Sequence, residues 1–321
     1  VYPWIGCGKC WYCDHGTENL CPTPRALGVN NDGGYADHVL VPHAKYLYPY
    51  GNLPEELACL YACSGITAFG AVKKAVGHDG GKPILVIGAG GVGLMGVRFA
   101  KAVLGREPIV ADIDENKRKL ALANGACAAV DPREKEARKQ VMDLTGGSGV
   151  AAAIDFVGNE ASAQFGWRAL GRGGRLVVVG LFGGSFSTPL PMFPFTGNAI
   201  MGSVTGTPAE MKEMMDIVTA GKAEPVPVIK RKLDEANATL TELSKGATAR
   251  LTEGSWPLGL VLMTKHKEEN FANIARAWAL LEPGGTLACA GANDDGAASL
   301  EKHVAKAFGG VEQLSKFHSR V

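Results

Sequence analysis

The chain has 321 residues, and its 33 basic and 32 acidic side chains leave a net charge of +1. This length allows about two domains with sizeable cores, and so balanced a charge gives no electrostatic reason to expect a nucleic acid or a membrane surface as partner. The sequence contains no apolar run of about 18 residues and no signal peptide, so we expect a soluble, cytoplasmic protein.

The first 21 residues contain four of the eight cysteines, namely Cys7, Cys10, Cys13 and Cys21. Four thiolates this close in sequence can hold one Zn²⁺ tetrahedrally and leave no open position for a substrate. In a long chain without a secretory signal, such crowding favours a metal over disulfides. We therefore predict a structural zinc site, with disulfides or free thiols as the alternatives, and expect His15 to be solvated.

The next segment predicts a strand and a short helix. Residues 34–41 alternate imperfectly, which favours a half-buried strand, and we expect His38 and His43 to lie at the surface. Residues 54–62 follow the pattern of a helix that opens with Pro54 and carries acidic side chains in its first turn.

Residues 83–112 form the most informative stretch, with a strand run, a glycine turn, a helical pattern and a second strand. Gly88 allows a tight turn, Gly90 lets the backbone approach a pyrophosphate, and Gly93 lets the helix pack on the sheet. This context predicts dinucleotide binding rather than an ordinary glycine-rich turn. The candidate cofactor-binding residues of the turn are Gly88, Gly90, Gly91, Val92 and Gly93.

An acid stands at the tip of the second strand of this unit. Asp112 lies about 20 residues beyond the turn, where a carboxylate can accept a hydrogen bond from the ribose 2′-hydroxyl. A carboxylate would repel a 2′-phosphate, so Asp112 favours NAD over NADP. Asp114 is the rival for this contact.

Strand and helix patterns then alternate up to about residue 202. Strands joined by helices pair in parallel with right-handed crossovers, so the fold class is α/β with a Rossmann doubly wound parallel sheet. Ligands bind at the carboxyl ends of such strands, where residues 156–158 and 180–182 also lie. The predicted strands are 84–87, 109–112, 128–130, 151–155, 175–180 and 199–202, and Met211, Met214 and Met215 have the spacing of a buried helix face.

Three motifs carry a family resemblance. They are Gly6-Cys7-Gly8-Lys9-Cys10-Trp11-Tyr12-Cys13 with Asn19-Leu20-Cys21, then Gly33-Gly34-Tyr35-Ala36-Asp37-His38, and Cys63-Ser64-Gly65-Ile66-Thr67-Ala68. Residues 1 to about 247 resemble the medium-chain zinc-dependent alcohol dehydrogenases. The resemblance implies a partial GroES-like β domain with the structural zinc lobe (1–75), an NAD-binding Rossmann domain (76–220) and a return to the first domain (221–250).

The same resemblance implies an activity, cofactors and site residues. The family transfers a hydride between an alcohol or aldehyde and NAD, uses zinc, and commonly forms dimers or tetramers. Cys63 matches the third ligand of the catalytic zinc, although by itself it fits a buried small residue, and Thr67 would lie against the nicotinamide. Val157, Gly180 and Leu181 fall in loops that line the cofactor in the family, with plain strand-end turns as the alternative.

Two departures from the family pattern leave alternatives open. The family supplies its other catalytic zinc ligands, a cysteine and a Gly-His-Glu segment, upstream of the zinc lobe. This sequence contains neither, and Gly77-His78-Asp79 is the nearest substitute. One alternative is therefore a catalytically inactive NAD-binding fragment.

The second departure is the tail, residues 251–321, for which we expect an appended α/β segment. Strands are predicted at 258–263 and 286–290, and helices at 268–281 and 297–308. Lys265-His266-Lys267-Glu268 and Pro283-Gly284-Gly285-Thr286-Leu287 resemble the non-catalytic half of a ribosomal RNA small-subunit class I methyltransferase. An RNA-binding module is thus a further alternative. The second motif also has a simpler explanation, because residues 281–287 repeat the pattern of residues 170–176, a helix-to-strand turn closed by a glycine pair.

Overall fold

The computed structural model divides the chain into two compact units, Val1–Asn31 with Val41–Glu253, and Asp32–Leu40 with Gly254–Val321. The predicted domain boundaries at residues 75, 220 and 250 stay predictions. The structure describes residues 1–34, 38–75, 81–231, 235–244, 258–262 and 286–290.

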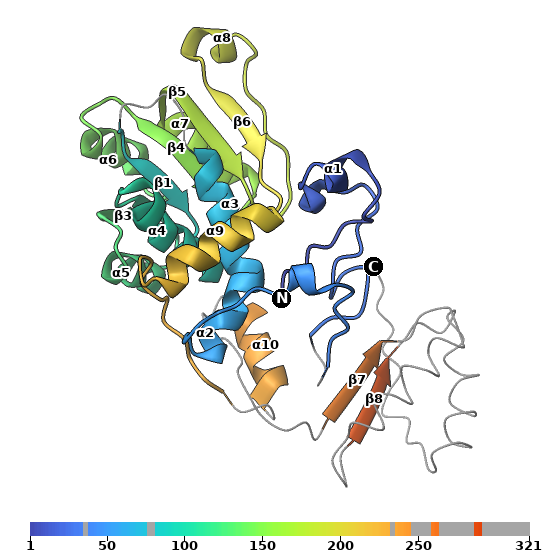
Figure 1. The fold of residues 1–321 in the computed structure, drawn as a ribbon. Helices are drawn as coiled ribbons and strands as arrows, with labels where there is room; N and C mark the ends of the chain where they lie inside the picture. Colours follow the sequence, from blue (N-terminus) through green and yellow to red (C-terminus); the bar gives the residue numbers. More distant parts are fainter. Residues whose placement is uncertain (35–37, 76–80, 232–234, 245–257, 263–285, 291–321) are drawn as a thin grey trace. The chain divides into compact units, whose positions relative to one another are not determined.

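A six-stranded parallel sheet organises the first unit, with strand order β3-β2-β1-β4-β5-β6 (Figure 1). This order is that of a doubly wound Rossmann sheet, so the predicted fold class is confirmed. β5 begins earlier than predicted, because Leu170 already pairs with Val150 before a register shift. The strands are β1 (Ile84–Ile87), β2 (Ile109–Ala111), β3 (Ala128–Val130), β4 (Val150–Asp155), β5 (Leu170–Val178) and β6 (Ala199–Gly202).

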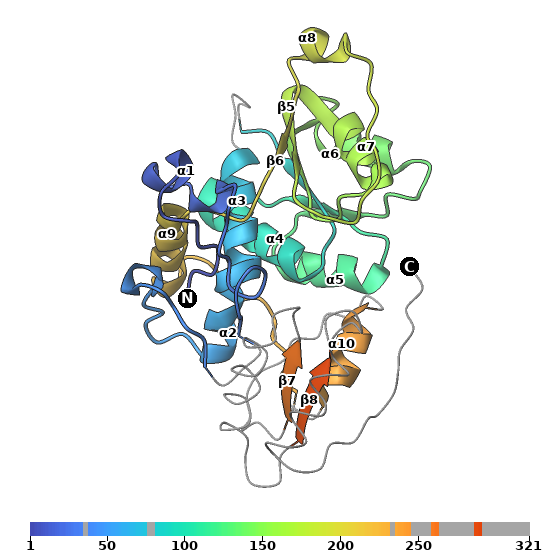
Figure 2. The same cartoon turned by 90° about the vertical axis from the view of Figure 1, so that its right-hand side faces the viewer.

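Helices cover both faces of this sheet (Figure 2). Alternate side chains of a strand point to opposite faces. Val86 accordingly belongs to the core under α3, α4 and α9, whereas Leu85 belongs to the core under α6 and α7. From residue 66 on, the described helices of the first unit, whether or not they contact the sheet, are α3 (Ile66–Ala75), α4 (Gly91–Leu104), α5 (Glu115–Ala123), α6 (Ala137–Leu144), α7 (Glu160–Ala169), α8 (Met192–Thr196), α9 (Pro208–Thr219) and α10 (Ala236–Ser244).

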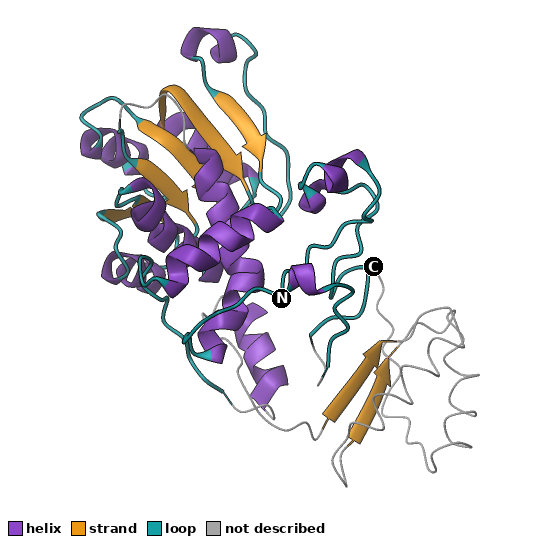
Figure 3. Cartoon of the chain, viewed as in Figure 1, coloured by secondary structure: helices purple, strands orange, loops and turns teal. Residues whose placement is uncertain are grey.

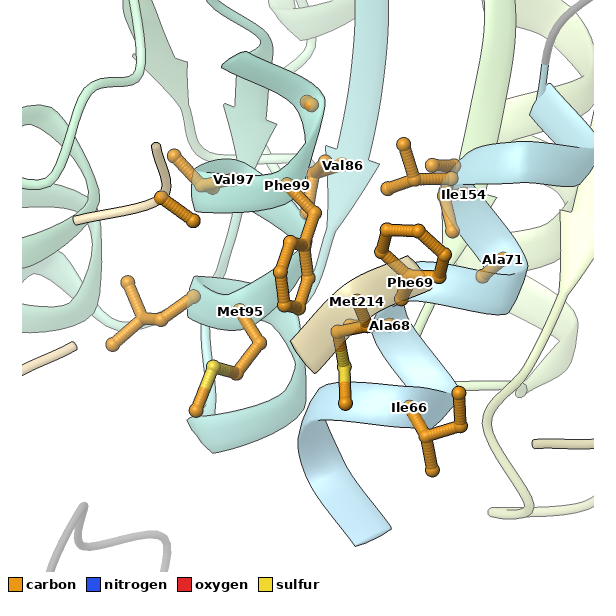
Figure 4. Packing of buried hydrophobic residues seen from close by; sticks show 14 of the residues in the cluster. Ile66, Ala68, Phe69, Ala71, Val86, Met95, Val97, Phe99, Ile154 and Met214 are labelled. Atoms are coloured by element: carbon orange, nitrogen blue, oxygen red, sulfur yellow. The ribbon is translucent and has the colours of Figure 1, made fainter. Parts of the chain in front are cut away.

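The larger core lies where α3, α4 and α9 meet (Figure 4). Phe69 and Phe99 pack edge to face with ring centroids 5.4 Å apart, an arrangement that aromatic pairs favour. The methionines Met211, Met214 and Met215 are buried on α9, as their spacing predicted.

The N-terminal segment consists mostly of loops (Figure 3), with the short helices α1 (Trp11–Asp14), η1 (Glu18–Leu20) and η2 (Ala44–Tyr46). The predicted strand 34–41 is wrong for residues 38–41, which have no regular structure. Among the described residues no strand pairs with them, and a strand needs a partner for its ladder hydrogen bonds.

The predicted helix 54–62 is observed as α2 (Glu55–Leu60), with Pro54 at its N-cap. A π-helical turn, Tyr61–Gly65, then joins α2 to α3. A Cβ at Gly65 would lie 2.6 Å from the Tyr61 ring, so glycine is needed where the helix widens. Such π-turns occur frequently at functional sites, and this one contains Cys63.

Two parallel strands are described in the second unit, β7 (Leu258–Leu262) and β8 (Thr286–Ala290), with Leu258 opposite Thr286. Both predicted strands of the tail are thus confirmed. The helices predicted at 268–281 and 297–308 lie outside the described residues. No helix in the described part of the chain has the length and apolar character needed to cross a membrane.

Candidate active site

The four cysteines of the N-terminal motif come together in one cluster. The Sγ atoms of Cys7, Cys10, Cys13 and Cys21 all lie within 4.8 Å of one another. Cys10 Sγ is 3.5 Å from Cys13 Sγ and 3.7 Å from Cys21 Sγ. Tetrahedral zinc with bonds of about 2.3 Å separates its sulfur ligands by about 3.8 Å. The donor set and its spacing therefore fit a closed, structural zinc.

The backbone around this cluster supports thiolate sulfurs. The N–H of Cys7 donates to Cys21 Sγ at 3.2 Å, and the N–H of Gly8 donates to Cys13 Sγ at 3.3 Å. The backbone N–H of Lys9 lowers the pKa of Cys7 to about 6. Each of these contacts stabilises the ionised sulfur that zinc binds.

His15 does not belong to the cluster. Its ring is exposed, stacks on Trp11 at 4.2 Å and places Nδ1 2.7 Å from the Trp11 carbonyl oxygen. The expectation of a solvated side chain is therefore confirmed.

A buried carboxylate that the sequence analysis missed anchors the segment just before Cys21. Glu18 accepts hydrogen bonds from the Gly6 N–H at 3.1 Å and the Tyr46 hydroxyl at 2.7 Å, and pairs with Lys45 at 2.8 Å. Burial opposes ionisation of Glu18, but the hydrogen bonds from Lys45 and Tyr46 outweigh it and lower the pKa. Glu18 thus ties the zinc lobe to η2.

The glycine turn has the geometry that a dinucleotide pyrophosphate requires. Gly88 adopts a φ of +88°, which favours glycine. A Cβ at Gly93 would overlap the Gly88 carbonyl oxygen, whereas a Cβ at Gly90 would meet no atom within 4 Å. The turn therefore has no space for a side chain at Gly93, whereas the space next to Gly90 is free of protein atoms. Gly91 and Val92 begin α4, whose N-terminal N–H groups suit a phosphate.

Asp112 links this turn to the neighbouring strand end. Its Oδ2 accepts a hydrogen bond from the Ala89 N–H at 2.7 Å, and its Oδ1 accepts one from the Asp114 N–H at 2.8 Å. A carboxylate has about four acceptor positions, so capacity for a ribose hydroxyl remains. Asp114 instead caps α5, where its side chain accepts from the N–H groups of Asn116 and Lys117.

Beside Asp112 lies a second acid, Asp131, which follows β3 and is 8% exposed. Arg118 donates to it at 3.1 Å, and Arg133 donates to both of its oxygens at 3.0 and 2.6 Å. The adjacent Arg133 guanidinium holds the pKa of Asp131 well below its usual range. Asp131 was not predicted from the sequence, although an acid directly after a predicted strand was the signal that identified Asp112.

The ends of β4 and β5 meet closely at the same edge of the sheet. Val157 contacts Gly88, and the backbones of Gly158 and Gly180 approach so closely that neither position has room for a Cβ. The side chain of Leu181 is 97% exposed. Val157 thus lies beside the glycine turn and Gly180 lies against Val157 and Gly158, while Leu181 projects into solvent.

Cys63 and Thr67 lie on neighbouring helical turns. Cys63 is exposed in the π-turn and Thr67 is half-buried at the start of α3. That end of α3 packs on the segment after β6, since a Cβ at Gly206 would lie 2.8 Å from Ile66. Cys63 joins no group of three or more metal-ligating side chains among the described residues. A catalytic zinc needs three protein ligands, so the described part of the chain does not complete one.

Comparison with known proteins agrees with these features. The profile of the zinc-binding dehydrogenases matches residues 91–220, and that of the alcohol dehydrogenase GroES-like domain matches residues 1–54. The chain is 37% identical over 244 residues to an NAD-dependent alcohol dehydrogenase of Sulfurisphaera tokodaii, which is 76% of this chain and 70% of the relative. A counterpart from Saccharolobus solfataricus is 38% identical with the same coverage.

A solved structure gives the same result. The alcohol dehydrogenase of Aeropyrum pernix superposes with a TM-score of 0.70 and 34% identity, covering 78% of this chain and 74% of that one. The four-thiolate lobe, the glycine turn and the doubly wound sheet occur together in one chain with these matches. The chain therefore belongs to the medium-chain zinc-dependent alcohol dehydrogenase family of NAD-linked oxidoreductases.

Proposed function

We propose that this chain transfers a hydride between an alcohol or aldehyde and NAD at the carboxyl edge of the β1–β6 sheet. The hydrogen bond from the Ala89 N–H to Asp112 carries the proposal, because it joins the glycine turn to the acid at the next strand end. The glycine turn can thus bind the pyrophosphate and Asp112 the ribose, and these two sites already contact each other.

The cofactor contacts follow from the placement of these residues. The pyrophosphate would lie over Gly90 and the first N–H groups of α4, at Gly91 and Val92, where the positive end of the helix dipole stabilises it. Asp112 would accept a hydrogen bond from the adenosine ribose. Val157 and Gly180 would line the cofactor further along the same edge.

The reacting end would lie at the start of α3. We assign Thr67 to the nicotinamide and Cys63 to the catalytic zinc, while the four-cysteine lobe would hold the structural zinc. Cys63 would be one ligand of the catalytic zinc, which would supply Lewis-acid chemistry at the alcohol oxygen, and Thr67 would orient the nicotinamide that takes up the hydride. A zinc at Cys63 needs two further protein ligands, which the described residues do not supply.

The first test is the zinc content of purified, chelator-washed protein together with NADH binding. NADH binding with about two zinc ions per chain supports the complete activity, because the lobe takes one and Cys63 the other. About one zinc with NADH binding and no alcohol oxidation would overturn the proposal in favour of the inactive NAD-binding alternative.

In a second test, an Asp112→Ala variant that binds NADH as tightly as the parent would remove the ribose assignment.

The exposed edge of the sheet supports a homo-oligomer. β6 is the last strand of the sheet and three of its four residues are exposed, so its outer backbone groups can pair with a second copy. Apolar side chains of β6 and of the chain segment before it are exposed, namely Leu181, Phe182, Leu190, Phe195 and Ile200. Light scattering of an Ile200→Lys variant should show a smaller assembly than the parent, and an unchanged mass would exclude this interface.

The remaining expectations concern location and the tail. Neither profile match extends beyond residue 220, and the RNA-binding alternative for residues 251–321 stays a prediction. A cytoplasmic location and the absence of nucleic-acid partners stay predictions as well.

A further inference from the structure

We propose that Asp131 determines cofactor preference together with Asp112, by holding Arg118 and Arg133 in ion pairs that keep them from a 2′-phosphate. This inference rests on the proposed contact of Asp112 with the adenosine ribose. It assigns to Asp131 a part of the preference for NAD over NADP that Asp112 alone would otherwise explain.

Asp131 accepts hydrogen bonds from both arginines with both of its carboxylate oxygens. Its side chain is 9% exposed, and Arg133 reaches it with Nε at 3.0 Å and Nη2 at 2.6 Å in a bidentate pair. Arg118 adds a third contact at 3.1 Å. Bidentate arginine–carboxylate pairs are among the strongest hydrogen-bonded contacts of side chains. Two cations are thus committed to one carboxylate.

The same two arginines lie beside the ribose-binding strand end. Arg118 Nη1 donates to the Asp112 carbonyl oxygen at 2.7 Å, and Arg133 Nη2 donates to the Ile113 carbonyl oxygen at 2.8 Å. The Arg133 side chain is 65% exposed. Its position therefore depends on the ion pair with Asp131 and on one carbonyl, and not on burial.

This arrangement has a consequence for selectivity. In dinucleotide sites an acid at this position accepts the 2′-hydroxyl of NAD, and a nearby arginine accommodates the 2′-phosphate of NADP. Here two arginines are near, but Asp131 offsets one of their two charges, holds the Nε and Nη2 donors of Arg133, and accepts from Nη1 of Arg118. Removing the Asp112 charge would end the repulsion of the phosphate without supplying donors for it. Removing the Asp131 charge as well would release the guanidinium groups.

The test compares the binding of NADPH and NADH to the full chain by quenching of protein fluorescence. Asp112→Ser should weaken NADH binding and leave NADPH binding weak. Adding Asp131→Asn should tighten NADPH binding about 10- to 100-fold over Asp112→Ser, because a hydrogen bond to a charged group is worth about this factor. Asp131→Asn alone should bind NADH like the parent and still reject NADPH, since Asp112 remains.

Two controls separate the arginines from a general change in charge. Asp112→Ser with Asp143→Asn removes the same formal charge at an exposed residue of α6 and should gain no NADPH affinity. Adding Arg133→Met to the Asp112→Ser, Asp131→Asn protein should cancel the gain. The melting temperature of each variant, measured alongside, shows that the folded chain is being compared.

The outcomes distinguish this proposal from the one on which it rests. Weaker NADH binding in Asp112→Ser, without an NADPH gain on adding Asp131→Asn, would overturn the role of Asp131 and leave the ribose contact in place. An equal gain in the Asp143→Asn control would also overturn it. Unchanged NADH binding in Asp112→Ser would remove the ribose assignment and this proposal with it.

Discussion

The Ser162 hydroxyl donates a 2.7 Å hydrogen bond to Oδ2 of Asp155, a carboxylate with no exposed surface at the end of β4. The other oxygen, Oδ1, accepts from the N–H groups of Val157 and Gly158, each at 2.9 Å. Gly158 in turn lies against the backbone of Gly180. One buried side chain therefore fixes the turn that we assign to the cofactor edge.

We expect Asp155→Asn to lower the free energy of unfolding by about 2 kcal/mol, because an amide replaces one carboxylate acceptor with a donor that faces other donors. NADH binding should weaken as the turn loosens. Urea unfolding and an NADH titration measure the two effects. Ser162→Ala removes one of the three hydrogen bonds to the Asp155 carboxylate and the one that Ser162 Oγ accepts from the Asn159 N–H. It sets no donor against other donors, so it should cost less than Asp155→Asn, and a larger cost would contradict this account.

Asp155 also predicts a pH dependence. Burial raises the pKa of Asp155, and the N–H of Gly158 and the hydroxyl of Ser162 only partly oppose this. The folded chain thus holds the proton more tightly than the unfolded chain. The resulting stabilisation is fully present below the ordinary value of 3.8 and is lost as the pH rises through the raised pKa. Relative to Asp155→Asn, the parent should lose stability across that window in urea unfolding at successive pH values.

The glycine turn offers a matched pair of substitutions. A Cβ at Gly93 would overlap the Gly88 carbonyl oxygen, so Gly93→Ala should cost about 3 kcal/mol of stability through overpacking and weaken NADH binding. Gly90 has an ordinary φ of −71° and open space at its Cβ, so Gly90→Ala should cost less than about 1 kcal/mol. Gly90→Ala should nevertheless weaken NADH, because the methyl group occupies space proposed for the pyrophosphate. Unimpaired NADH binding would show that the pyrophosphate lies elsewhere.

The sequence predicted the strands and the glycine turn of the sheet well, because these elements depend on residues that are close in sequence. The apolar runs at 84–87 and 128–130 became strands with the predicted bounds, and the glycines between strand and helix lie where the turn requires them. The contacts of Asp131 and Asp155 were missed for a different reason. Most of their partners, such as Arg133 and Ser162, are close in sequence, but these contacts depend on the path of the turn after each strand, which periodicity does not give.

The structural zinc should be separable from the rest of the fold. Cys10→Ser should lower the zinc content by about one ion per chain and reduce the melting temperature, since zinc binding contributes to the folding free energy of such a lobe. Cys127→Ser replaces an exposed cysteine outside the cluster and should change neither quantity. Metal analysis and calorimetry of both variants provide the check. Equal zinc contents in the two variants would exclude a four-thiolate site.

The contacts of Glu18 should couple the stability of the zinc lobe to its packing against η2. Glu18→Gln removes the buried charge that pairs with Lys45 and accepts from the Tyr46 hydroxyl. We expect a loss of about 1–3 kcal/mol in stability and faster release of zinc to a chelator. Glu213→Gln, which breaks an exposed pair with Lys73, is the matched control and should cost less than about 1 kcal/mol.

The N-terminal segment shows where sequence patterns were insufficient. The four cysteines identified the zinc lobe by spacing alone, but the strand expected at 34–41 is absent from residues 38–41. The π-turn at Tyr61–Gly65 also had no signal in the periodicity, since it depends on the space that Gly65 leaves for Tyr61. Strand pairing depends on neighbours distant in sequence, and the π-turn depends on a steric contact between residues four apart, and hydrophobic periodicity reveals neither.

The order of the strands bears on how the cofactor edge is assembled during synthesis. β1 lies between β2 and β4, so a nascent chain that ends after β3 has the glycine turn and Asp112 but lacks Val157 and Gly180. β4 must then add to the free side of β1, a contact between distant parts of the sequence that forms slowly. We therefore expect the ability to bind NAD to arise late, after the ribosome has released most of the sheet.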